Sequence, residues 1–267
     1  MNFNGSRLGF WFRPQSRITR TKVLVFYDPT TYYVGPTGTV VQNFYTQGDV
    51  NPATDIWPNI QNREIAAGYQ PELVIGYENL PADMNVYSHV WDIGYVSPYL
   101  EPYWYSNPWT DPTNKLTTFI QDGGSMFMLG ENIALNRPGS YPELTRWETI
   151  TSFLTQIGAN QGPTNIQIDP LYYGGVTSIV KPDFLIANNN NMVEFAAPGS
   201  WLDIGSGVAM TTPGIGGQAY PAAMWETGSL SNAPAGAIIS VLDVNFLTDA
   251  FLQNDFIDNI IASLMQR

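Results

Sequence analysis

Short apolar runs recur along the chain, and each is closed by a glycine or an aspartate. Their β-branched and aromatic residues, in stretches of four to eight, are typical of strands buried on both faces of a parallel sheet. The pattern predicts five core strands, at residues 23–28, 73–77, 86–93, 125–129 and 237–242.

Three segments with helical spacing of apolar residues alternate with the later strands. The first begins at Asp111, an N-cap followed by proline, and stops at Gly123. The second segment follows a capping box that begins at Ser140, and it stops at Gly158. The third segment covers residues 255–264. Strands that alternate with helices imply right-handed βαβ units. We therefore predict an α/β fold with a doubly wound, mostly parallel sheet and helices on both faces.

Two regions depart from this alternation. Residues 95–112 form an aromatic loop punctuated by prolines, directly after a predicted strand. Residues 160–235 contain an asparagine run at 188–191 and few long apolar runs, which indicates a β-rich insertion before the last strand. We expect a basic, aromatic N-terminal arm over residues 1–22 and a single domain over 23–267.

The pattern resembles a known family in two places. Residues Leu116 to Asn132, followed by a helix that ends at residues 157–159, resemble the helix, Gly-Gly turn, strand and elbow of class I glutamine amidotransferase-like domains. Residues 236–261 are similar to the closing strand and helix of non-enzymatic members found in secreted and surface proteins. The resemblance implies a flavodoxin-like α/β sandwich.

The resemblance also bears on activity. The enzymes of this family carry a cysteine at the elbow, with a histidine and a glutamate further on. Here the elbow reads Gly130-Glu131-Asn132, the sequence has no cysteine, and no histidine follows His89. Without a thiolate and a suitably placed base, amidotransferase chemistry is not expected, which implies the non-enzymatic branch.

Charge is distributed unevenly along the 267 residues. The first 22 carry five of the eleven lysines and arginines and no acidic residue. The remaining chain has six cations and 23 acidic residues, a net charge of 6 − 23 = −17. Aromatic residues, among them Trp11, are interleaved with the arm cations. The arm is suited to docking on an acidic, partly apolar surface, and the alternative is an edge strand or terminus folded back on its own body.

Composition excludes several function classes. A net charge of −12 disfavours nucleic acid as a partner, and the absence of cysteine removes disulfides and thiolate metal sites. No apolar run approaches a membrane span, and residues 1–20 lack the apolar segment of a signal peptide. His89 falls in mid-strand, which favours a core or interface histidine. No Walker A sequence is present, and we expect no cofactor and no metal.

Polar side chains at the carboxyl ends of the predicted strands are the candidate site, because ligands collect at this edge of open α/β sheets. Converging carboxylates there can bind a hard cation such as Ca²⁺ or act as an acid and base pair. Alternatively, each accepts backbone N–H bonds at the turn into its helix, and we favour this second interpretation. The candidates are Asp28, Asp92, Glu131, Asn132, Asp243 and Asn245.

The sequence favours a non-catalytic structural or surface protein that associates with copies of itself or with other assembly proteins, in a virion or another extracellular assembly. The alternative is a glycan-binding or glycan-processing protein that uses the aromatic loop and the strand-end carboxylates. Enzymatic activity is not decided by the residues alone. The expected partner-binding residues are Arg7, Arg13, Arg17, Arg20, Trp11, Tyr103, Trp104, Tyr105 and Trp109.

Overall fold

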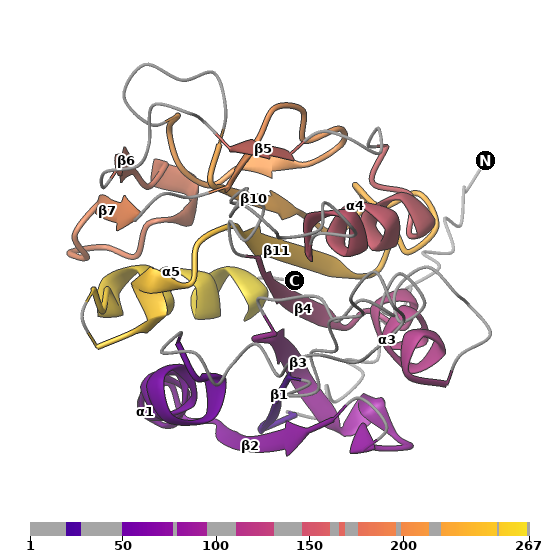
Figure 1. Cartoon of the computed structure of the whole chain (residues 1–267). Helices are drawn as coiled ribbons and strands as arrows, with labels where there is room; N and C mark the ends of the chain where they lie inside the picture. Colours follow the sequence, from indigo (N-terminus) through magenta and orange to yellow (C-terminus); the bar gives the residue numbers. More distant parts are fainter. Residues whose placement is uncertain are drawn as a thin grey trace, which may run out of the picture.

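A seven-stranded sheet forms the centre of the protein (Figure 1). The computed structural model describes residues 20–27, 50–76, 79–94, 111–130, 146–160, 166–168, 176–195, 199–213, 220–249 and 251–265. The five parallel strands lie in the order β2-β1-β3-β4-β11, which is the flavodoxin-like order 2-1-3-4-5. They are β1 (Lys22–Tyr27), β2 (Gln70–Ile75), β3 (Tyr87–Asp92), β4 (Ser125–Leu129) and β11 (Ala237–Val241).

Two antiparallel strands extend the sheet beyond β11. Strand β10 (Ala222–Trp225) pairs with β11, and β9 (Val208–Ala209) pairs with β10. The predicted α/β fold with a mostly parallel sheet is therefore confirmed, and all five predicted core strands are present. The largest boundary difference is in β2, which begins at Gln70 instead of Leu73.

Helices cover both faces of the sheet, as predicted (Figure 1). Helices α1 (Trp57–Ala66) and α5 (Asn254–Met265) pack on one face, over Trp91 and Phe127. Helices α3 (Asp111–Gln121) and α4 (Arg146–Gln156) pack on the other face, over Met126 and Met128. Successive residues of a strand thus pack in the apolar cores on opposite faces of the sheet. Because both faces are buried, the strands appear in the sequence as continuous apolar runs.

The predicted helix stops are also present. Gly123 and Gly158 both have positive φ, of 88° and 86°, and each follows the last turn of its helix. A Cβ at Gly158 would lie 2.1 Å from Oγ of Ser231, so this glycine also permits a close approach of the loop before β11. The capping box that starts at Ser140 lies outside the described residues.

The sequence pattern did not predict helix α1 or the π-helical turn η2 (Pro52–Ile56) before it. Within α1, Ile60 and Glu64 are the buried residues, and one of them is charged, so the apolar stripe is too weak to indicate a helix. A signal was nevertheless present at the start. Asn51 accepts a hydrogen bond from the N–H of Ala53, and Asp55 accepts one from the N–H of Asn51.

The predicted β-rich region over residues 160–235 is joined to the central sheet. It contains β9 and β10 together with two small antiparallel pairs, β5 (Ile166–Ile168) with β8 (Gly199–Trp201), and β6 (Val176–Ile179) with β7 (Met192–Phe195). The chain just after β9 joins β10 to the hairpin β6–β7 through backbone hydrogen bonds. The N–H of Met210 donates to the carbonyl of Ala222, and the carbonyl of Met210 accepts from the N–H of Lys181. The N–H of Thr212 donates to the carbonyl of Ile179. The hairpin β6–β7 is thus tied to the sheet rather than projecting from it.

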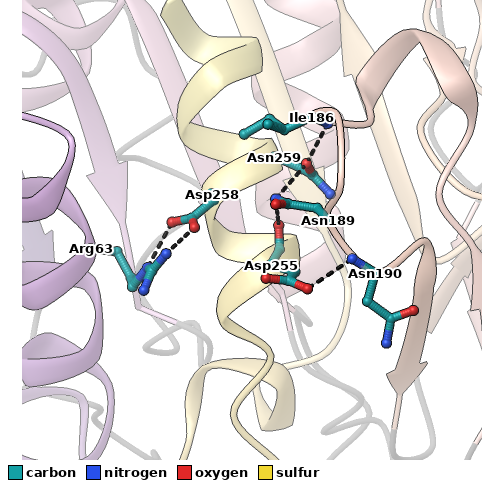
Figure 2. Close-up of polar contacts among 7 residues, drawn as sticks. All are labelled: Arg63, Ile186, Asn189, Asn190, Asp255, Asp258 and Asn259. Atoms are coloured by element: carbon teal, nitrogen blue, oxygen red, sulfur yellow. Dashed lines mark hydrogen bonds and ion pairs between the residues drawn. The ribbon is translucent and has the colours of Figure 1, made fainter.

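The loop between β6 and β7 also docks on helix α5 (Figure 2). Oδ1 of Asn259, which is fully buried, accepts hydrogen bonds from the N–H of Ile186 at 2.9 Å and from Nδ2 of Asn189 at 3.2 Å. The carboxylate of Asp255 accepts one from the N–H of Asn190 at 2.8 Å. The asparagine run therefore serves as an anchor for the inserted region.

Candidate functional site

The carboxyl edge of the parallel strands is where the fold places ligands, and the structure describes part of it. Asp92 is the last residue of β3, and Asp243 follows β11 by two residues. Strand β4 lies between them, with Met128 aligned to Asp92 on one side and to Ser240 on the other. The two carboxylates therefore reach the same edge from strands that are not direct neighbours.

Both of these carboxylates bind into the turns that follow their strands. Asp92 is fully buried, and its Oδ1 accepts a hydrogen bond from the N–H of Gly94 at 3.1 Å. Asp243 is also fully buried, and its Oδ1 accepts hydrogen bonds from Asn245, at 2.7 Å from the backbone N–H and at 3.0 Å from Nδ2. Such bonds to a residue two positions on fix a turn. The two aspartates accept backbone N–H bonds, as in the interpretation that the sequence favoured, whereas Asn245 donates to Asp243 in both of these bonds.

Most of the remaining predicted site residues lie outside the described part of the chain. Arg20 is the exception: its Nη1 donates to the carbonyl of Tyr87 at 3.4 Å, so this end of the arm contacts its own body. The structure gives no placement for Asp28, Glu131, Asn132, Arg7, Arg13, Arg17, Trp11, Tyr103, Trp104, Tyr105 or Trp109.

The point where the arm joins the body is held by several contacts. The N–H of Gln70 donates to the carbonyl of Thr21 at 2.8 Å, and Nζ of Lys22 lies 3.7 Å from the carboxylate of Glu72. The hydroxyl of Tyr87 donates to the same carboxylate. Burial and this hydrogen bond raise the pKa of Tyr87 above its ordinary range. The arm therefore leaves a fixed position at Arg20, and strand β1 begins one residue earlier than predicted.

A buried polar cluster joins α1 to β3. Nε2 of His89 lies 2.7 Å from Oε1 of Glu64, and Nε1 of Trp91 donates to the same oxygen at 2.7 Å. His89 and Glu64 have no exposed surface, and the ring of Tyr69 packs edge-on against the imidazole at 5.2 Å. The prediction that His89 is a core histidine is confirmed. Its partner Glu64 was missed, although it stands four residues after Ile60 on the buried face of the helix.

Two further features, a metal centre and a membrane-spanning helix, are absent from the described residues. Within those ranges, no three side chains of histidine, aspartate or glutamate are grouped so that they could hold a metal ion. No helix in the same ranges is long and apolar enough to cross a bilayer.

A small groove lies between α3 and the 3-10 turn η4 (Met84–Val86), with a volume of about 180 Å³. This is smaller than the roughly 300–1,000 Å³ of most small-molecule sites. Its charged residues serve the local fold, because Nζ of Lys115 donates to the carbonyl of Leu80 and Asp83 accepts from the N–H of Asn85. These bonds tie both charged side chains to neighbouring backbone.

Several solved structures have a fold similar to that of this chain, at low sequence identity. The mmIFT52 N-terminal domain matches with a TM-score of 0.51 at 13% identity, over 91% of this chain and 96% of that domain. The exo-β-1,4-mannosidase Op5Man5 from Opitutaceae bacterium strain TAV5 matches with a TM-score of 0.51 at 11% identity. The match covers 91% of this chain and 36% of the enzyme, so the chain spans about a third of the mannosidase.

A glutamine amidotransferase from Thermotoga maritima is also among the structural neighbours, with a TM-score of 0.44 at 9% identity over 93% of this chain and 99% of that one. No protein-family model and no curated protein sequence matches the chain. At these identities, the matches with TM-scores of 0.51 show a shared fold and carry no statement about activity.

Proposed function

We propose that this chain is a non-catalytic structural or surface protein that self-associates through its N-terminal arm, in a virion or another extracellular assembly. The observation that carries the proposal is the opposition of charge. Residues 1–22 hold five cations and no acid, whereas the rest of the chain has a net charge of −17. Because every copy carries both charges, contacts of an arm with a neighbouring body are electrostatically favourable.

The described part of the carboxyl edge supports a non-catalytic role. Asp92 and Asp243 have no exposed surface and are bonded into turns, so neither is presented to a substrate. The sequence also lacks the cysteine on which amidotransferase chemistry depends. These features fit the non-enzymatic branch of glutamine amidotransferase-like domains, and we include that branch in the proposal.

The mass of the full-length protein in solution tests the role of the arm. In Arg7→Ser/Arg13→Ser/Arg17→Ser, three cations are lost while Arg20, which bonds to Tyr87, is kept. We expect light scattering to give a lower oligomer mass for this variant than for the wild type at 0.1 M salt. The triple Arg→Lys variant retains the charge and should associate. Equal masses for the wild type and the serine variant would contradict the proposal.

The non-catalytic part of the proposal has a separate test. A glycosidase needs two carboxyls about 5–9.5 Å apart beside its substrate, and Glu131 is the strand-end carboxylate whose removal is most informative. Hydrolysis of a polysaccharide by the full chain, abolished in Glu131→Gln with an unchanged melting temperature, would overturn the non-catalytic assignment. We expect no hydrolysis in either protein.

A further inference from the structure

The outer face of hairpin β6–β7 combines exposed apolar side chains with negative charge. Ile179 and Met192 lie directly opposite each other in the hairpin, and they are 47% and 53% exposed. Among the paired positions of the described strands, this is the one where both partners are large, apolar and exposed. Thr177 and Glu194 form the next pair on the same face, and Glu194 is exposed. We call these four residues the hairpin face.

Two acidic residues contact or belong to the loop that joins the strands of the hairpin face. The loop between the strands adds the exposed Asp183, and Asp255 contacts Asn190, two residues before Met192. The cation nearest in sequence is Lys181, and its Nζ lies over the ring of Tyr220 at 5.6 Å. The face itself therefore combines the exposed apolar pair with the exposed carboxylate of Glu194.

The hairpin is hydrogen-bonded to neighbouring segments on both of its outer sides. The N–H of Ile179 donates to Oγ1 of Thr212, and the N–H of Thr212 donates to the carbonyl of Ile179. On the other side, Gln253 bonds to both the N–H and the carbonyl of Glu194, which occupies backbone groups of β7 that an added strand would need. A partner must therefore contact the side chains of the face, and a preformed face loses little entropy on binding.

We propose that the hairpin face receives residues 1–19 of a second copy of this chain, an inference that rests on the proposed function. The arm has the complementary composition: Phe10, Trp11 and Phe12 stand next to Arg13. Aromatic rings pack favourably on methionine and isoleucine, and a guanidinium pairs with a carboxylate. Nineteen residues span up to about 60 Å when extended, which is enough to reach a neighbour from the fixed position at Arg20.

Single substitutions on the face test where the arm binds, and the chain offers matched controls. We expect Ile179→Thr and Glu194→Lys each to raise the dissociation constant for self-association about tenfold, because each removes one part of the complementarity. Ile75→Thr and Glu226→Lys are the controls, since Ile75 is also a strand residue, 44% exposed, and Glu226 is an exposed acid outside the hairpin. The controls should associate like the wild type, and all four should keep its melting temperature.

Complementation between two full-length variants tests whether the contact joins two copies. The arm variant Arg7→Ser/Arg13→Ser/Arg17→Ser retains an intact face, and Ile179→Thr/Glu194→Lys retains an intact arm. Each alone should be largely monomeric, and an equimolar mixture should form a dimer, because one arm and one face remain complementary.

The outcomes separate this inference from the proposed function. If the wild type associates through its arm but the face variants associate equally well, the hairpin face is not the receptor and the proposed function stands. If the face variants are monomeric and the mixture stays monomeric too, the arm does not bind the face of a second copy. If the wild type is monomeric at every concentration and salt, the proposed function fails, and this inference fails with it.

Discussion

His89 and Glu64 meet in the core, with Nε2 of the imidazole 2.7 Å from Oε1 of the carboxyl group. Trp91 donates to the same oxygen, so one carboxyl oxygen on helix α1 holds two side chains of strand β3. The second oxygen, Oε2, has no hydrogen-bond partner among the described residues. The contact fixes α1 over the sheet with polar atoms, where most of the neighbouring core is apolar.

Removal of the Glu64 side chain should therefore be costly. Glu64→Ala leaves Nε1 of Trp91 and Nε2 of His89 buried without their partner, and we expect a loss of about 2–6 kcal/mol in the free energy of unfolding, about 1–3 kcal/mol for each group. Glu64→Gln keeps an acceptor oxygen and the side-chain shape, so its loss should be smaller. Urea unfolding measures both, with the exposed Glu226→Gln as a control that should change stability by less than about 0.5 kcal/mol. A loss in Glu64→Ala no larger than in this control would show that the contact does not hold α1.

Tyr87 should make the stability of the protein sensitive to alkali. Burial, the hydrogen bond to Glu72 and the negative charges of Glu72 and Asp83 raise the pKa of this phenol. In the unfolded chain it ionises near pH 10, whereas the folded protein keeps it protonated at higher pH. The protonated phenol of Tyr87 therefore contributes its full stabilisation of the folded state below about pH 10. This contribution is lost progressively as the pH rises above that value.

The comparison of wild type with Tyr87→Phe isolates this contribution. The phenylalanine variant cannot ionise at this position, so its urea midpoint should fall less between pH 8 and pH 11 than that of the wild type. Other tyrosines titrate in both proteins and cancel in the difference. The same decrease in both proteins would mean that ionisation of Tyr87 is not linked to folding.

Asn259 should hold the β6–β7 loop on helix α5. Its Oδ1 accepts two hydrogen bonds from the loop, so Asn259→Ala should cost about 1–3 kcal/mol and speed hydrogen exchange at the N–H of Ile186. Asn190→Ala is the matched control, because Asn190 reaches Asp255 through its backbone N–H, which the substitution keeps, and the side-chain bond that it loses, from the N–H of Met192, lies within the hairpin and does not reach Ile186. Unchanged exchange at Ile186 in Asn259→Ala would show that the loop is held by other contacts.

The sheet could be predicted because its strands are buried on both faces and so appear as uninterrupted apolar runs, as in Ser125–Leu129. The ends of α3 and α4 could be predicted because Gly123 and Gly158 have backbone conformations that other residues rarely adopt. Helix α1 could not, since one of its buried residues is Glu64, and a charged residue in the core interrupts the apolar period.

The position of the candidate site at the strand ends could be predicted from the sequence, but the hydrogen bonds of its side chains could not. The alternation of strands and helices indicates which residues stand at the carboxyl edge, and Asp92 and Asp243 lie there. Whether a carboxylate faces solvent or turns back onto the chain depends on the path of the next two residues, which periodicity does not specify. The anchor between Asn189 and Asn259 joins positions 70 residues apart, and a pattern of local periods carries no sign of such a pairing.

Sedimentation equilibrium of the full-length protein at 0.1 M and 1 M salt tests the central claim most directly. The screening length falls from about 10 Å to about 3 Å between these salt concentrations, so contacts between a basic arm and an acidic body should weaken. We predict a mass above that of the 29.6 kDa monomer at 0.1 M salt, and a mass closer to the monomer at 1 M salt. Contacts of the aromatic residues in the arm should preserve some association at 1 M salt. A protein that sediments as a monomer at both salt concentrations, at every protein concentration, would contradict the account.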